Sequence, residues 1–159
     1  MSHLSRSRTR KFLYQMLYAS TFSKIENDSF REAFFSWIFD ASIDEEYLQS
    51  MFESIIKNEE FLIEVLTMYA PKFDIENMDL SYVLPIFIGT TEILIFPEEI
   101  PVKVSINEAV EISKIYGDDS SRKMVNGVLN NVLKNEEQLI NKFKLFKSTT
   151  YKNIFFWHT

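Results

Sequence analysis

The chain has 159 residues and a formal net charge of −6, and it contains no cysteine, 3 glycines and 4 prolines. A sequence without cysteine excludes disulfide scaffolds, thiol catalysis and cysteine zinc sites, and so little glycine and proline argues against a turn-rich all-β fold. Aromatic residues make up 15% of the chain, which is more apolar surface than a disordered protein carries. We therefore expect one domain folded around a hydrophobic core.

Charge is distributed unevenly along the chain. Residues 1–24 carry a net charge of +5, residues 25–101 carry −14 and residues 102–159 carry +3. The basic ends suit a polyanion, and the acidic middle suits a basic partner. The most apolar window, residues 82–97, is shorter than a membrane span and is interrupted by a proline and a glutamate. We expect it to form a buried helix in a cytoplasmic protein without a membrane segment.

Helical periodicity dominates the sequence. Apolar residues repeat along one face around residues 12–20, 47–56 and 125–133, as is typical of amphipathic helices. The basic, acid-free start would also suit an organelle transit peptide, but its amphipathic spacing favours a helix of the fold. The spacing predicts an all-α fold with about seven helices, near residues 8–22, 30–39, 44–57, 59–70, 80–95, 106–116 and 121–146.

Local signals predict where several helices begin and end. Ser105 has the capping-box spacing to Glu108, and Ser42 has it to Glu45. In a capping box, the serine hydroxyl accepts a hydrogen bond from the glutamate's amide, and the glutamate carboxylate accepts one from the serine's amide. Gly117 directly follows a periodic segment, so it suits the left-handed residue that often ends a helix.

Two residues depart from a regular helical pattern. Pro85 falls in the first turns of the fifth predicted helix, so that helix either begins near Leu84 or is kinked. Gly127, inside the last predicted helix, costs about 1 kcal/mol relative to alanine. We expect the close approach of a neighbouring helix to compensate for this cost.

Residues that usually carry catalysis are poorly placed. The two histidines, His3 and His158, lie near the two ends of the chain. Adjacent carboxylates, such as Glu45/Glu46 and Asp118/Asp119, point to different faces of a helix and are expected to be surface charge. Neither a glycine-rich phosphate loop nor an HExxH motif occurs in the sequence. We expect neither an enzyme nor a cofactor or metal.

A cluster of cations marks the start of the chain. Arg6, Arg8, Arg10 and Lys11 lie before and within the first turn of a predicted helix, where the helix dipole disfavours positive charge. Phosphate binding would explain the cluster, and a solvated, frayed N-terminus is the alternative.

Residues 100–130 carry a family resemblance. They read Pro-x-x-Val-x-Ile-Asn-Glu-Ala from Pro101, then a glycine at position 117, then Ser-x-Lys-Met-Val-Asn-Gly-Val-Leu from Ser121. This pattern resembles the C-terminal signature of the NusB transcription antitermination family. The basic start followed by Met16-Leu17-Tyr18 is similar to the family's Arg-rich start and Ala-Leu-Tyr, and Thr91-Glu92-Ile93 is similar to its Tyr-Glu-Leu. Residues 25–80 match only in helical length and spacing.

The resemblance implies a fold, a function and partners. The fold would be two small packed helical bundles, an N-terminal subdomain over about residues 1–78 and a C-terminal subdomain over about 79–147, followed by a tail over 148–159. The function would be binding of single-stranded boxA-type RNA together with a small-subunit ribosomal protein of the NusE type. This complex would act on the RNA polymerase elongation complex during transcription of ribosomal RNA.

The resemblance also suggests which residues make contacts. Tyr18 offers a ring for base stacking, with core packing as an equal alternative. Ser120, Ser121 and Lys123 open the last predicted helix, whose free amides suit phosphate, although ordinary capping would also explain the serines. Thr91 and Glu92 would face the ribosomal protein. The residues expected to contact RNA are Arg6, Arg8, Arg10, Lys11, Tyr18, Ser120, Ser121, Lys123 and Met124.

Departures from the family pattern keep other functions open. The family usually has an acidic residue at the position of Ser120, phenylalanine at Met124 and tyrosine at Thr91. These differences allow a helical protein-interaction module that has lost RNA binding. A NusB-like domain attached to an RNA cytosine methyltransferase is a third interpretation, disfavoured because no cofactor-binding domain follows in this sequence.

The aromatic tail raises a separate question. Phe155, Phe156 and Trp157 together would be an aggregation liability if they were exposed. We therefore expect the tail to pack on the domain's own core, with formation of a homodimer as the alternative.

Overall fold

The computed structural model describes residues 3–22, 43–72, 74, 79–146 and 155. This part of the chain contains seven helices and no strand, which confirms the all-α prediction. The predicted helix at 30–39 lies outside the described residues. The helices are α1 (His3–Ser20), α3 (Glu45–Lys57), α4 (Glu59–Tyr69), α5 (Leu80–Leu94), α6 (Val102–Tyr116), α7 (Asp119–Lys134) and α8 (Glu136–Leu145).

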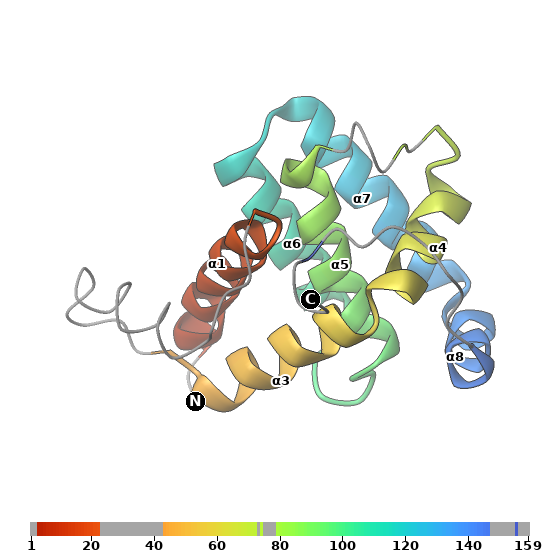
Figure 1. Ribbon diagram of the computed structural model, residues 1–159, viewed down its shortest axis with the longest axis horizontal. Helices are drawn as coiled ribbons and strands as arrows, with labels where there is room; N and C mark the ends of the chain where they lie inside the picture. Colours follow the sequence, from red (N-terminus) through yellow and green to blue (C-terminus); the bar gives the residue numbers. More distant parts are fainter. Residues whose placement is uncertain (1–2, 23–42, 73, 75–78, 147–154, 156–159) are drawn as a thin grey trace.

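Helix α5 is the centre of the fold. It packs against each of the other described helices, and Figure 1 shows it enclosed by them. Its sequence explains this position, because every residue from Val83 to Leu94 is buried and a helix that is apolar on all sides must be surrounded by protein. The carboxylate of Asp79 caps α5 by accepting the amide of Ser81 at 2.9 Å. The helix thus begins at Leu80, not near Leu84, and Pro85 lies inside it.

Neither predicted capping box marks the start of its helix. Pro101 is the N-cap of α6, because proline has no amide that would be left without a partner at a helix start. Ser105 therefore lies inside α6 and is buried. Helix α3 is capped by Asp44, whose carboxylate accepts the amide of Tyr47 at 3.1 Å. Ser42, the predicted cap, lies outside the described residues.

The long helix predicted over 121–146 is two helices. Asn135 is both the C-cap of α7 and the N-cap of α8, and its side chain donates to the carbonyl oxygen of Asn131 at 2.9 Å. Two glutamates follow it in the first turn of α8, where negative charge is favourable. The periodicity of the apolar residues alone does not reveal this break.

The glycines that allow close packing are not at the predicted position. Gly117 has an extended backbone, with φ −128° and ψ −153°, so the left-handed prediction is wrong. A Cβ at Gly117 would lie 2.7 Å from the Oγ of Ser121. A Cβ at Gly127 would meet nothing within 4 Å, so the predicted helix approach is also wrong there. The close approach is at Gly89 in α5, where a Cβ would lie 2.6 Å from a methyl group of Leu129 in α7.

Replacing Gly127 by alanine should raise the free energy of unfolding by about 0.5–1 kcal/mol, because alanine loses less conformational entropy in a helix. The position is exposed and has room for a methyl group. Urea unfolding measures the change. Gly89→Ala is the control, since the same gain is opposed there by contact with Leu129, and it should be the less stable variant. A Gly127→Ala protein less stable than the wild type would contradict this account.

The described part of the tail packs on the core. Phe155 is 2% exposed, and its ring meets the ring of Phe87 edge-on at 6.4 Å between centroids. This agrees with the expectation for Phe155, whereas Phe156 and Trp157 lie outside the described residues. Among the residues that the structure describes, none of the helices combines the length and hydropathy that crossing a membrane requires.

Candidate nucleic-acid interface

The four cations at the start of α1 point in different directions. Successive residues are about 100° apart around a helix, so residues two apart lie on nearly opposite sides. Arg8 is exposed and Lys11, three residues on, is half-buried on the same side. Arg10, by contrast, is 1% exposed, and Arg6 lies half-buried toward α3. Only two of the four predicted phosphate contacts therefore lie on the outer face.

This outer face continues along the whole helix. Its residues recur every three or four positions and extend into the turn that follows α1. Tyr18 is 44% exposed and Phe22 is 64% exposed, so core packing does not account for Tyr18. Two of its members, Gln15 and Phe22, were not predicted, although continuing the spacing from Arg8 would have found them. The outward stripe of α1 consists of Arg8, Lys11, Gln15, Tyr18 and Phe22.

The aromatic rings at the end of the outward stripe lie next to a stacked pair of tyrosines. The rings of Tyr18 and Phe22 lie 5.2 Å apart, and Tyr18 lies 6.3 Å from Tyr14. Tyr14 stacks nearly parallel on Tyr116 of α6 at 4.3 Å, and Gln15 donates to the Tyr116 hydroxyl at 2.8 Å. Burial, followed by the neighbouring phenols, raises the pKa of Tyr14 to about 12. The exposed ring of Phe22 thus contacts that of Tyr18, which in turn contacts the buried, neutral ring of Tyr14.

The start of α7 lies at the same end of the molecule, next to the end of α6 (Figure 1). Lys123 and Ser120 are exposed there, and Met124 is 36% exposed. Asp118 caps the helix by accepting the amide of Ser121 at 2.9 Å, and this hydrogen bond lowers the pKa of Asp118. Ser121 itself is buried. The protein's own carboxylate occupies the Ser121 amide, so ordinary capping is present here, and phosphate binding at the start of α7 stays a prediction.

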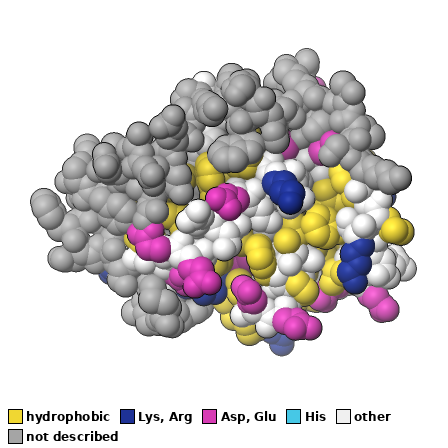
Figure 2. All heavy atoms as spheres, turned by 60° about the horizontal axis from the view of Figure 1, so that its bottom comes forward, with side chains coloured by type: hydrophobic (Ala, Val, Ile, Leu, Met, Phe, Trp, Pro, Cys, Tyr) yellow, Lys and Arg dark blue, Asp and Glu magenta, His cyan; other side chains and the backbone are white. Residues whose placement is uncertain are grey.

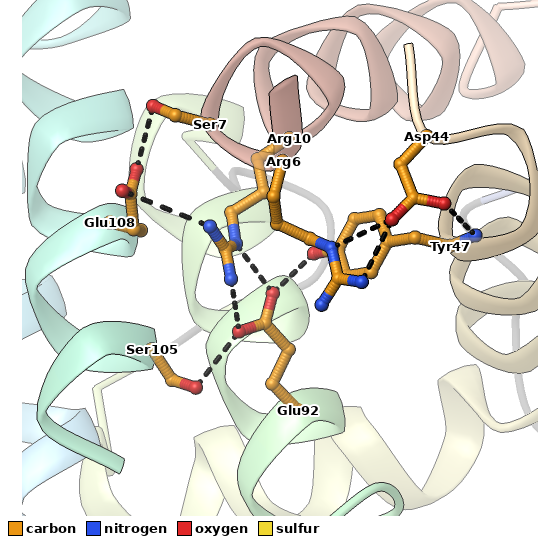
Figure 3. Close-up of polar contacts among 8 residues, drawn as sticks. All are labelled: Arg6, Ser7, Arg10, Asp44, Tyr47, Glu92, Ser105 and Glu108. Carbon is orange, nitrogen blue, oxygen red and sulfur yellow. Dashed lines mark hydrogen bonds and ion pairs between the residues drawn. The ribbon is translucent and has the colours of Figure 1, made fainter. Parts of the chain in front are cut away.

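A buried polar network connects the core-facing side of α1 to neighbouring helices (Figure 3). Arg10 donates to both oxygens of Glu92, Nε to Oε2 at 2.8 Å and Nη2 to Oε1 at 3.1 Å. Both side chains are 1% exposed. The Tyr47 hydroxyl of α3 donates to Glu92 Oε2, and the Ser105 hydroxyl of α6 donates to Oε1 at 2.8 Å. The carboxylate in α5 thus joins α1, α3 and α6.

Charges in this network are set by their neighbours. Burial alone would lower the pKa of Arg10, but the hydrogen bond to Glu92 and the nearby negative charges raise it overall, so the guanidinium is charged. Burial and the charge of Glu92 raise the pKa of Tyr47, which keeps its hydroxyl as a donor. Glu108 accepts from Ser7 at 3.0 Å and lies 3.8 Å from Arg10 Nη1. It therefore links α6 to α1 and does not cap a helix.

Several residues expected to contact RNA or a partner are buried in or near this network. Arg10 and Glu92 are each 1% exposed and Thr91 is fully buried, so the structure does not present these side chains to RNA or to a protein partner. Arg6 is engaged as well, because it pairs with Asp44 at 2.8 Å. The single carboxylate in the most apolar segment could have revealed the buried ion pair, since a buried charge requires a partner.

Comparison with known proteins decides the family. Residues 7–134 match the model of the NusB family. The chain belongs to the NusB family. This NusB-family chain is 32% identical over 145 residues to the transcription antitermination protein NusB of Alkaliphilus oremlandii, which covers 87% of the chain and 97% of that relative. The protein of the same name from Clostridium perfringens is 32% identical over 137 residues, covering 83% of the chain and 98% of the relative.

The match includes both features described above. The outward stripe and the buried network, from Ser7 to Glu108, lie within the NusB-family segment. The resemblance drawn from the motif at residues 100–130 is therefore confirmed at the level of the family. Both relatives are named as transcription antitermination proteins.

Proposed function

We propose that this chain is a transcription antitermination factor that binds single-stranded boxA-type RNA through the outward stripe of α1. It would do so together with a small-subunit ribosomal protein of the NusE type, on the RNA polymerase elongation complex during ribosomal RNA transcription. The observation that supports this most is the order of residues on the stripe, where two cations are followed by two exposed aromatic rings that contact each other.

Single-stranded RNA suits this arrangement for two reasons. Arg8 and Lys11 would pair with phosphates, while Tyr18 and Phe22 would stack on bases, each stack contributing about 1–3 kcal/mol. Arg8 and Tyr18 are about 15 Å apart along the helix axis at 1.5 Å per residue, so cations and rings would contact successive nucleotides. Lys123 at the start of α7 would extend the surface. Arg6, Arg10 and Ser121 are excluded from this set by their contacts.

One observation favours a second candidate, a helical interaction module without RNA binding. Asp118 and Asp119 place two carboxylates at the start of α7, and Asp119 already pairs with Arg122 at 3.1 Å. Negative charge at the start of α7 opposes phosphate there. Binding measurements with RNA separate the two candidates.

Tyr18→Ala should weaken binding of a fluorescent boxA-like RNA by roughly tenfold or more, because one base loses its stacking partner.

The double variant Arg8→Ala/Lys11→Ala should reduce the slope of log affinity against log salt by about 1.4, since each phosphate contact on a single strand contributes about 0.7. Fluorescence anisotropy at several salt concentrations, with and without a NusE-type protein, measures both.

Lys57→Ala serves as the matched control, because Lys57 is an exposed cation at the end of α3, away from the stripe. It should leave the affinity and the salt slope close to those of the wild type. If the wild type failed to bind RNA with or without the protein partner, the chain would be an interaction module instead.

A further inference from the structure

A surface cavity of about 330 Å³ lies between the first turns of α3 and the loop that joins α5 to α6. With this side of the molecule turned forward, Figure 2 shows Asp and Glu side chains along the lower edge of the described surface. The carboxylates of Glu46 and Glu99 belong to the cavity and are exposed at its rim. Its apolar walls are Tyr47, Met51, Phe96 and Ile100.

Net charge in the cavity is negative. Arg6 also lines it, but this guanidinium donates to Asp44 through Nε at 3.1 Å and Nη2 at 2.8 Å (Figure 3). Burial alone would raise the pKa of Asp44, but the hydrogen bonds from Arg6 and from the Tyr47 amide lower it. The two charges therefore cancel, and Glu46 and Glu99 remain.

We propose that this cavity receives one arginine or lysine side chain from the basic protein partner of the chain. Long cationic side chains bury their methylene stems on apolar surface and keep the charged head among polar groups. Met51, Phe96 and Ile100 would contact the stem, and Glu46 and Glu99 would accept hydrogen bonds from the head. The volume is at the lower end of the range for ligand pockets, so it fits a single side chain better than a larger organic ligand.

The surroundings favour a protein as the source of this cation. Residues 25–101, which include α3 and the whole loop, carry a net charge of −14, and complementary potentials steer a basic protein toward such a surface. The inference rests on the proposed function for the existence of a basic partner. It places the contact at an accessible site, in contrast to the buried Thr91 and Glu92.

The first test is the double variant Glu46→Gln/Glu99→Gln, which keeps the shape of both side chains and removes both charges. Its affinity for a NusE-type ribosomal protein should fall about tenfold or more, since a hydrogen bond to a charged group is stronger than a neutral one. Glu53→Gln is the matched control, because Glu53 is an exposed carboxylate of α3 outside the cavity. Isothermal titration calorimetry gives the affinities. Equal affinity of the double variant and the wild type would overturn the proposal.

Two further measurements separate this proposal from the proposed function. Binding of RNA alone should be unchanged in the double variant, because the cavity is not part of the outward stripe; an equal loss of RNA affinity would overturn the assignment. If the wild type did not bind the NusE-type protein, the partner assignment would fail, and the cavity would be judged with the peptide acetyl-Ala-Arg-Ala-amide. Methyl NMR shifts at Met51 and Ile100 that disappear in the double variant would support the site, and unchanged methyl signals would refute it.

Discussion

Replacing Glu92 by alanine should lower the free energy of unfolding by about 3–5 kcal/mol, the cost of removing one partner of a buried ion pair. The variant leaves the charged guanidinium of Arg10 in the interior with its main partner gone, and the hydroxyls of Tyr47 and Ser105 lose an acceptor. The free energy of unfolding of a domain is commonly only about 5–15 kcal/mol, so this variant should lose a large fraction of it. Urea denaturation followed by far-UV circular dichroism measures the change.

Two comparisons isolate the buried pair as the cause. Glu111→Ala removes an exposed carboxylate that pairs with Lys114 at 3.1 Å, and such surface pairs contribute about 0–1 kcal/mol. The double variant Arg10→Met/Glu92→Leu removes both charges and should be more stable than Glu92→Ala. A Glu92→Ala protein as stable as Glu111→Ala would show that the network does not stabilise the fold.

Phe155→Ala should lower the free energy of unfolding by about 3 kcal/mol, at the lower end for removal of a buried phenylalanine side chain. The ring is 2% exposed and packs edge-on against Phe87 in the central helix. For a chain of this length the melting temperature should drop by roughly 6–12 °C. Differential scanning calorimetry measures it.

Leu145→Ala is the control for the tail, because Leu145 is 80% exposed and such surface changes stay within about 0.5 kcal/mol. Sedimentation velocity on the same Phe155→Ala sample tests the alternative. An unchanged melting temperature with loss of self-association would mean that Phe155 serves a homodimer and not the core of its own chain.

Much of the fold was predictable because apolar periodicity reports which face of each helix is buried. The same argument could have sorted the cations of α1. Arg10 is three and seven residues before Leu13 and Leu17, both fully buried, so it shares their face, whereas Arg8 does not. A count of positive charges near the N-terminus misses this difference, and only the helical phase reveals it.

The remaining errors arise from contacts between distant segments. Arg10 and Glu92 are 82 residues apart, and local patterns can show that a buried carboxylate needs a partner without showing which one. The serine at position 105 matches a capping box locally, but its hydroxyl is used by Glu92 across the helix interface. The cavity at α3 combines residues from three parts of the chain, which no single motif contains.

The buried network also limits how this protein can diverge. A substitution at Arg10 or Glu92 alone leaves an uncompensated charge in the interior and costs much of the stability of the fold, so the two positions are expected to change together. Arg8 and Lys11 on the outward stripe are under no such restriction, because each contacts solvent. Single substitutions can therefore change the outward stripe while the buried network holds α1 in place.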